Sequence, residues 1–282
     1  MIVDTHQHFW NLDVLEYWWL NESLGPLYRT YSPQELAPQL RAAGVSQTVL
    51  VQSANSYDDT RYMLRKADEF AWIAGVVGWV PLWNPREAEV MLSRFAAHPK
   101  FRGVRHLIHE EQNPAWLLQD TVIEGLRLLA ERGLTFDAVP VRPEELATVA
   151  TAAEQVPELR VVIDHLAKPP IKEGGWQPWA DILRRCAELP NVYAKISGLN
   201  TAAPENWTAS DLQPYVDYAA ELFGAERLMF GSDWPVAVLA GTYQQVKDET
   251  QTVLAGLNAE QKNAIWSETA TAFYNLASAD EV

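Results

Sequence analysis

The chain is poor in cysteine, and its basic residues are outnumbered by acidic ones. Cys186 is the one cysteine among 282 residues, so no disulfide can form within the chain, as is typical of a reducing cytoplasm. It lies in a helical stretch over residues 179–189, and we expect it to pack in the interior. With 22 Lys and Arg against 37 Asp and Glu, the net charge is -15. This charge disfavours nucleic acid and anionic membrane surfaces as partners.

Long apolar runs, targeting signals and linkers are also missing. No stretch approaches the roughly 18 to 20 consecutive apolar residues of a membrane span. The N-terminus lacks the basic segment and apolar stretch of a secretory signal, and no proline- or glycine-rich linker divides the chain. We therefore expect a cytoplasmic protein with a single domain over residues 1–282. The oligomeric state stays open, with a homo-oligomer as one option.

A glycine-rich phosphate loop, expected after the first strand of a doubly wound open sheet, is absent as well. Short, nearly continuous apolar runs are present instead, and each is followed by a helical stretch. Such runs are typical of strands covered on both faces. Eight repeats of this unit favour an α/β fold of the closed (β/α)8 TIM barrel type, with the open sheet as the alternative. We expect strands over residues 2–8, 47–53, 72–80, 101–107, 134–139, 160–166, 192–198 and 227–233.

The stretches between the predicted strands carry helix-start signals. Ser32-Pro33-Gln34-Glu35 and Asn84-Pro85-Arg86-Glu87 each combine an N-cap, a proline in the first turn and a carboxylate three residues after the cap. Apolar residues between Leu118 and Leu129 recur at helical spacing. These patterns predict helices between the strands.

Two histidines in the first predicted strand give the earliest sign of chemistry. Side chains two residues apart in a strand share a face, so His6 and His8 lie together, with Asp4 and Ile2 on the same face. Two imidazoles at this spacing can meet one metal ion or one substrate oxygen. Surface histidines show the same spacing, so the interpretation depends on what the other strands contribute.

The other strands also end in polar groups. Five of the six histidines fall at predicted strand ends, where a barrel carries its chemistry, and His98 alone lies elsewhere. Unpartnered charges there would be costly to bury, so we expect His6, His8, His165 and Asp233 to form one site. The polar side chains at these ends are His6, His8, Arg105, His106, His109, Asp137, Asp164, His165, Lys168, Lys195, Ser197 and Asp233.

These motifs resemble the amidohydrolase superfamily (the amidohydrolase 2 type), in the sugar-lactonase branch of L-fucono- and L-rhamnono-lactonases. The matching segments are residues 3–10 (VDTHQHFW), 103–106 (GVRH), 134–137 (LTFD), 164–169 (DHLAKP), 195–199 (KISGL) and 229–235 (MFGSDWP). The resemblance implies that His6, His8 and His165 surround the reactive centre and that Asp233 is the general base. One departure is His109, where these enzymes often carry glutamine.

The chemistry of ester hydrolysis suits these groups. Asp233 can take a proton from water and later deliver it to the ring oxygen. The histidines can polarise the carbonyl, either as hydrogen-bond donors or by holding a divalent ion. We expect no metal or one divalent ion, held by His6, His8, His165 and Asp233, with zinc as the leading candidate. Many enzymes of the resembled superfamily hold two metals with a bridging carboxylated lysine at the end of a middle strand. Strands four and five here offer Arg105, His106 and Asp137 instead, which disfavours a two-metal site.

Substrate contacts are expected from the same rim. Arg105, His106 and Lys168 are candidates to hold the lactone, and His109 is a further one. Flat aromatic faces suit sugar rings, so Trp19, Trp83 and Trp234 are expected to line the pocket.

Two other strand residues have structural interpretations. Asp137 is expected to orient Arg105 or a histidine, and Lys195 can be the partner in a core ion pair.

The sequence therefore predicts a lactone hydrolase that opens an aldonolactone, with a small-molecule lactone as its partner. Alternatives are a hydrolase of another small lactone, such as a pyrone-dicarboxylate or a muconolactone, and a metal-dependent decarboxylase of the same superfamily. The resemblance also bears on the charge of the substrate, because similar enzymes that hydrolyse dicarboxylated pyrone lactones need an extra arginine after strand seven. The loop over residues 197–203 contains none, which favours a neutral sugar lactone over a multiply charged one. A non-catalytic sugar-binding barrel is the third option.

Overall fold

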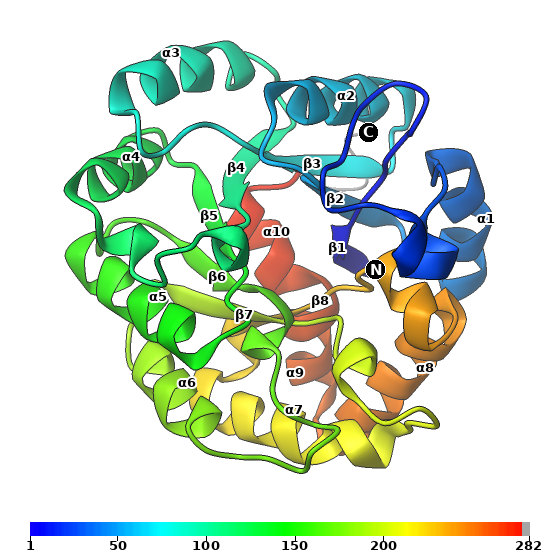
Figure 1. The fold of residues 1–282 in the computed structure, drawn as a ribbon. Helices are drawn as coiled ribbons and strands as arrows, with labels where there is room; N and C mark the ends of the chain where they lie inside the picture. Colours follow the sequence, from blue (N-terminus) through cyan, green and yellow to red (C-terminus); the bar gives the residue numbers. More distant parts are fainter. Residues whose placement is uncertain (278–282) are drawn as a thin grey trace.

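The computed structural model describes residues 1–277 and contains one sheet of eight parallel strands in chain order. Each strand pairs with the next, which confirms the predicted barrel and excludes the doubly wound alternative. Figure 1 views the molecule with the strands in the centre and the helices around them. The strands are β1 (Val3–Gln7), β2 (Gln47–Val51), β3 (Ile73–Gly78), β4 (Phe101–His106), β5 (Thr135–Ala138), β6 (Val161–Ile163), β7 (Val192–Ile196) and β8 (Leu228–Phe230).

The outer ring consists of helices that follow the strands. The capping signals mark real starts, since α1 begins at Pro33 and α3 at Pro85, where Asn84 accepts from the Glu87 amide. The helix predicted from Leu118 begins two residues later, because Leu118 ends a separate 3-10 turn. The helices are α1 (Pro33–Ala43), α2 (Tyr57–Glu69), α3 (Pro85–Phe95), α4 (Asp120–Glu131), α5 (Pro143–Gln155), α6 (Trp179–Ala187), α7 (Ala209–Phe223), α8 (Tyr243–Val253), α9 (Ala259–Asn263) and α10 (Thr269–Tyr274).

The barrel closes between β1 and the segment that follows β8. Thr5 donates its hydroxyl to the Phe230 carbonyl at 2.6 Å, and the Asp233 amide donates to the His6 carbonyl at 2.8 Å. The buried Asp4 carboxylate accepts from the Ser232 amide at 2.8 Å. Closure therefore brings the functional residues of the first and last strands together.

All eight predicted strands were longer than the observed ones, and the two largest errors at a C-terminal end fall on β6 and β8. The sequence placed Leu166 and Asp233 inside strands, whereas β6 ends at Ile163 and β8 at Phe230. The physical reason is a left-handed backbone, which cannot continue a strand: φ is 55° at His165 and 58° at Asp233.

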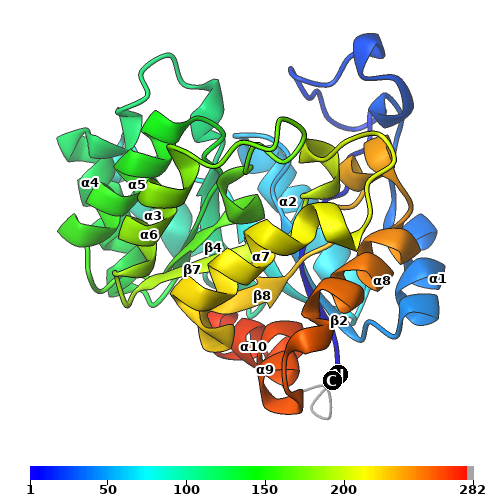
Figure 2. The ribbon, with the colours of Figure 1, turned by 90° about the horizontal axis from the view of Figure 1, so that it is seen from below.

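The remaining features fix the two ends of the barrel. The apolar core runs through the molecule, and Cys186 is buried in α6, as predicted. Helices α9 and α10 lie at the end where the chain begins, and the loop between β1 and α1 projects from the opposite end (Figure 2). Within residues 1–277, no helix combines the length and the apolar character that a membrane crossing requires.

Candidate active site

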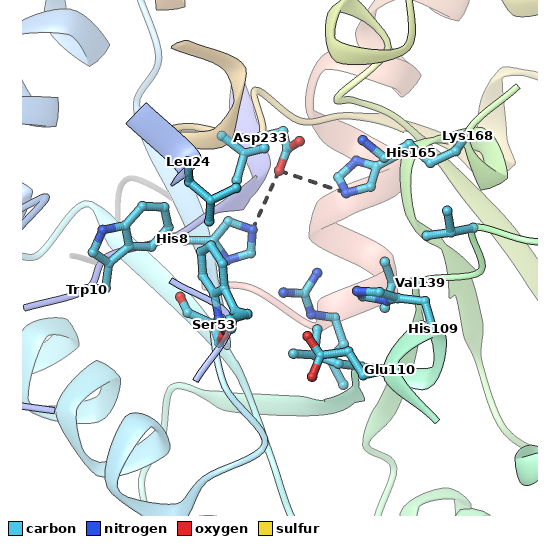
Figure 3. A pocket seen from close by; sticks show the side chains of 15 residues that line it. His8, Trp10, Leu24, Ser53, His109, Glu110, Val139, His165, Lys168 and Asp233 are labelled. Carbon is cyan, nitrogen blue, oxygen red and sulfur yellow. Dashed lines mark hydrogen bonds and ion pairs between the residues drawn. The ribbon is translucent and has the colours of Figure 1, made fainter. Parts of the chain in front are cut away.

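Three histidines and one carboxylate meet at the ends of strands β1, β6 and β8. His6 lies in β1 and His8 directly follows it, whereas His165 and Asp233 lie just beyond β6 and β8. All four are at most 4% exposed. The distances from Asp233 Oδ1 to the three Nε2 atoms are 3.5 Å for His8 and 3.8 Å for both His6 and His165. Figure 3 shows His8 and His165 on either side of this carboxylate.

The Nδ1 atom of each imidazole is held by a second group. His8 Nδ1 lies 2.8 Å from the Val51 carbonyl, and His6 Nδ1 lies 3.2 Å from an Asp164 oxygen. The Val51 carbonyl only accepts, so His8 carries its proton on Nδ1 and points its Nε2 lone pair at His6 Nε2, 3.1 Å away. His6 Nδ1 lies near both an acceptor, Asp164, and a donor, Lys195. We assign its proton to Nδ1 as well, because Arg105 Nη1, which can only donate, lies 3.3 Å from its Nε2. His165 Nδ1 pairs with the Ser197 hydroxyl at 2.9 Å.

Burial determines the charges of this group. It lowers the pKa of His8, lowers that of His165 to about 4, and lowers the pKa of His6 well below its usual value. Burial alone would raise the pKa of Asp233, but the neighbouring His165 and Lys168 outweigh it and hold that pKa well below its usual range. At neutral pH the site therefore consists of neutral imidazoles around an ionised carboxylate.

The donor set fits one divalent cation. His6, His165 and Asp233 offer ligand atoms that all lie within 4.8 Å of one another, and His8 Nε2 adjoins two of them. Asp233 Oδ2 is buried with no hydrogen-bond partner among the described residues. Facing lone pairs beside an unpartnered carboxylate are the arrangement that a cation such as Zn²⁺ satisfies.

Gly198, which follows β7, makes this close arrangement of side chains possible. A Cβ atom there would lie 2.6 Å from Asp233 Oδ2 and 2.7 Å from His165 Nδ1. Its φ of 58° is also in the left-handed region that favours glycine. Both facts require glycine at this position.

A second layer of charges lies beneath the histidines. Lys195 Nζ contacts Asp137 at 2.6 Å and Asp164 at 3.0 Å, and it lies 3.1 Å from His6 Nδ1. The core ion pair predicted for Lys195 is confirmed. The prediction that Asp137 orients Arg105 or a histidine is wrong, because its partners are Lys195 and the Tyr274 hydroxyl, the latter at 2.7 Å.

Asp164 takes the orienting role that the sequence analysis gave to Asp137. It contacts His6 and Arg105, each at 3.2 Å. Burial alone would raise its pKa, but His6 and Lys195 hold that pKa well below its usual value. Asp164 therefore remains ionised and holds both neighbours in place.

A cavity of about 370 Å³ opens onto this group. Four of the predicted substrate residues line it: Arg105, Lys168, His109 and Trp19. Burial lowers the pKa of Lys168, whose ammonium donates to the Thr201 hydroxyl at 3.0 Å. The full lining is His8, Trp10, Trp19, Leu24, Ser53, Arg105, Leu107, His109, Glu110, Val139, Val141, His165, Lys168, Asp233 and Val236.

The other three predicted substrate residues do not line the cavity. His106 follows Arg105 in β4 and so faces the other side of the sheet, where its ring stacks on Trp116 with centroids 4.0 Å apart. Trp83 packs against both of these rings. Trp234 is 2% exposed and packs edge-on against aromatic neighbours, including Tyr31.

The sequence analysis missed part of the wall. Trp10 and Leu24 come from the loop between β1 and α1, and Glu110 from the turn after β4. The Trp18 indole donates to the Glu110 carboxylate and so joins these two loops across the cavity mouth. The sequence showed that an apolar loop follows strand one, but it did not show that this loop lines the cavity.

Comparison with known proteins identifies the family of the chain. Residues 3–276 match the family described as Amidohydrolase. An L-fucono-1,5-lactonase of Burkholderia ambifaria is 40% identical over 242 residues, which cover 86% of this chain and 82% of the relative. A second L-fucono-1,5-lactonase, from Burkholderia multivorans, is 33% identical, with 97% and 96% covered. A crystal structure of an amidohydrolase from Burkholderia multivorans with bound zinc superposes with a TM-score of 0.90 at 33% identity, covering 98% of this chain and 100% of that chain.

Proposed function

This chain belongs to the amidohydrolase family, and on that basis we propose that it hydrolyses the ester bond of a sugar lactone to give the free sugar acid. Relatives named L-fucono-1,5-lactonase, 40% and 33% identical, support this activity and favour a 1,5-lactone of a sugar as the substrate. The observation that carries the proposal is the ionised Asp233 carboxylate, which faces three Nε2 atoms at the base of the cavity.

Asp233 is proposed as the general base. No Nε2 atom approaches its Oδ1 closer than 3.5 Å, and its Oδ2 has no partner among the described residues, so no strong hydrogen bond saturates the carboxylate. It can accept a proton from water as the oxygen attacks the lactone carbonyl carbon. When the ring C–O bond breaks, the same carboxyl group can return that proton to the leaving oxygen.

The oxyanion is proposed to be stabilised by cationic side chains rather than by His6 and His8. The sequence analysis allowed His6 and His8 to act as donors, but their Nδ1 protons are engaged by Asp164 and Val51. Arg105 and Lys168, which both line the cavity, can instead donate to the charge that develops on the carbonyl oxygen.

We propose His6, His8, His165 and Asp233 as the ligands of a single divalent ion, with zinc favoured because a 33% identical relative was crystallised with zinc bound. When bound, such an ion would supply Lewis-acid polarisation and a more acidic water. The residues around it retain the roles given above: Asp233 moves the proton, and Arg105 and Lys168 meet the oxyanion.

The cavity suits a neutral, partly apolar lactone. Trp10 and Trp19 offer aromatic surface for the C–H face of a sugar ring, while His109 offers a polar contact. Glu110 adds a carboxylate to the wall, which would repel a multiply charged acid such as a pyrone-dicarboxylate.

A pH-indicator assay on a panel of sugar lactones tests the proposal. We expect acid release from a sugar 1,5-lactone, with loss of that signal in Asp233→Asn and no loss in Asp248→Asn, a matched change on the exposed face of α8. The panel should include 1,4-lactones, a pyrone-dicarboxylate and an aromatic acid monitored for carbon dioxide. Absence of acid from every lactone would contradict the proposal, and carbon dioxide release would replace it with the decarboxylase.

A further inference from the structure

We propose that Arg105 sets the metal affinity of this site by competing with a divalent cation for the Nε2 lone pair of His6. The inference rests on the single-metal site proposed above and assigns to one side chain the control of how tightly that site binds. It concerns the free energy of metal binding and not the hydrolytic step.

Arg105 is fixed beside the lone pair. Its Nη1 lies 3.3 Å from His6 Nε2 and 3.2 Å from Asp164 Oδ2, and its Nη2 donates to the Gln52 carbonyl. The residue is 4% exposed. A planar guanidinium held at both nitrogens has little freedom to swing away, so the charge stays where the structure has it.

A metal on His6 would have to share this space. A zinc–nitrogen bond of about 2.1 Å would leave the ion within about 5.5 Å of Nη1, because Nη1 lies 3.3 Å from the bonded nitrogen. Two cations that close in a buried site repel each other strongly, since little water screens them. Lys195 adds a further positive charge 3.1 Å from the opposite ring nitrogen of His6.

The contact between Arg105 and His6 also stabilises the site when no metal is bound. Without a cation, the facing lone pairs of His6 and His8 would repel at 3.1 Å. The Arg105 N–H directed at His6 Nε2 offers one of these lone pairs a proton donor. The guanidinium therefore both stabilises the metal-free arrangement and opposes the loaded one, and each effect weakens metal binding.

Zn²⁺ titration against a chromophoric chelator tests the inference on the full chain, with no lactone present. We expect Arg105→Met and Arg105→Gln to bind one Zn²⁺ at least about tenfold more tightly than the unaltered protein, because both lack the charge. Arg105→Lys keeps a cation and should bind Zn²⁺ more weakly than either. Circular dichroism establishes which variants are folded, and the glutamine variant retains an N–H group for the Gln52 carbonyl if the methionine variant fails.

Two matched controls separate competition at His6 from a general effect of charge. Lys168→Met removes another cation, a partly buried one, that lines the same cavity but donates to Thr201 and Gly198 rather than to a histidine. Arg102→Met makes the same change on the same strand, at a residue that does not line the cavity. We expect a smaller gain in Zn²⁺ affinity from the first and none from the second.

Equal or weaker Zn²⁺ binding by both neutral Arg105 variants would overturn the inference, as would an equal gain in Lys168→Met. Arg105→Met should give no gain in Zn²⁺ affinity when it is added to a His6→Gln variant and compared with His6→Gln alone. A gain that persists in this comparison would also overturn the inference. Because no substrate is used, these results are independent of the lactone panel. A protein that hydrolyses no lactone would refute the proposed function alone.

Discussion

Two buried polar clusters lie one below the other in this barrel, and they differ in how completely their charges are paired. In the lower cluster, Lys195 lies 2.6 Å from Asp137 and 3.0 Å from Asp164, so each charge has an opposite partner. In the upper cluster, the Asp233 carboxylate faces lone pairs at 3.5 Å or more. Similar burial with different pairing indicates different roles: the lower cluster holds the structure and the upper one retains unused bonding capacity for chemistry.

The largest effect should come from the upper cluster and should fall on activity alone. Asp233→Asn removes the proposed base, and we expect kcat/KM to fall by about 10⁴-fold, the upper range for a general acid–base group. The free energy of unfolding should change by less than about 1 kcal/mol, because the new amide can donate to the imidazole lone pairs. Initial rates and urea titrations measure the two quantities. Equal losses in both would remove the distinction between the clusters.

The matching change in the lower cluster should fall on stability. Lys195→Met leaves two carboxylates buried without their cation, and breaking such a pair costs about 3–5 kcal/mol. Urea unfolding measures this loss. The double variant Lys195→Met/Asp137→Leu should recover part of it, because apolar groups then replace the pair. A single variant as stable as the unaltered protein would show that the lower cluster is not structural.

The fold and the members of the upper cluster could be predicted from the sequence. Apolar runs that alternate with helical stretches predicted the barrel, and strand-end positions predicted the four residues that the structure brings together: His6, His8, His165 and Asp233. Such predictions are strong because all parallel strands of a barrel end at the same rim. Residues at their C-terminal ends therefore lie near one another.

Partner choice within the core could not be predicted. Nothing in the residues around Asp137 and Asp164 indicates which carboxylate meets Arg105, because that depends on side-chain direction and strand register. His106 shows a different error. It directly follows Arg105, and the alternation of a strand would have turned it away from the cavity.

A further buried carboxylate, Asp59, makes the stability of the protein depend on pH. Asp59 accepts from the Ser53 amide at 2.7 Å and from the Tyr17 hydroxyl at 3.3 Å, and burial raises its pKa to about 7. The folded state then binds a proton more tightly than the unfolded chain does. The resulting stability is complete below about pH 4, the ordinary range of an aspartate, and is lost as pH rises through about 7.

Asp59→Asn should remove this part of the pH dependence. We expect the unaltered protein to lose up to about 4 kcal/mol between pH 4 and 7 from this group, at about 1.4 kcal/mol for each pKa unit. The asparagine variant should give a flatter curve over the same interval. Thermal or urea unfolding at several pH values provides the test. Parallel curves for the two proteins would show that Asp59 does not titrate in this range.

The smallest effect should follow metal removal. Arg105 and Lys168 remain beside the cavity when no ion is present, and both can meet the developing oxyanion. We therefore expect treatment with a chelator to lower kcat/KM by less than about tenfold. Metal analysis of the treated protein verifies that the ion has been removed. Complete loss of turnover, restored by added Zn²⁺, would show that the upper cluster cannot act without its ion.

The left-handed run from His165 to Lys168 has a consequence for chemical synthesis. Four successive residues adopt φ between 48° and 60°, values that suit the mirror-image amino acid better than the natural one. A semisynthetic protein with D-alanine at position 167 would meet its preferred backbone geometry there, while the same replacement in the middle of α5 would break the helix. This turn is therefore a place where inverted chirality would support the native fold.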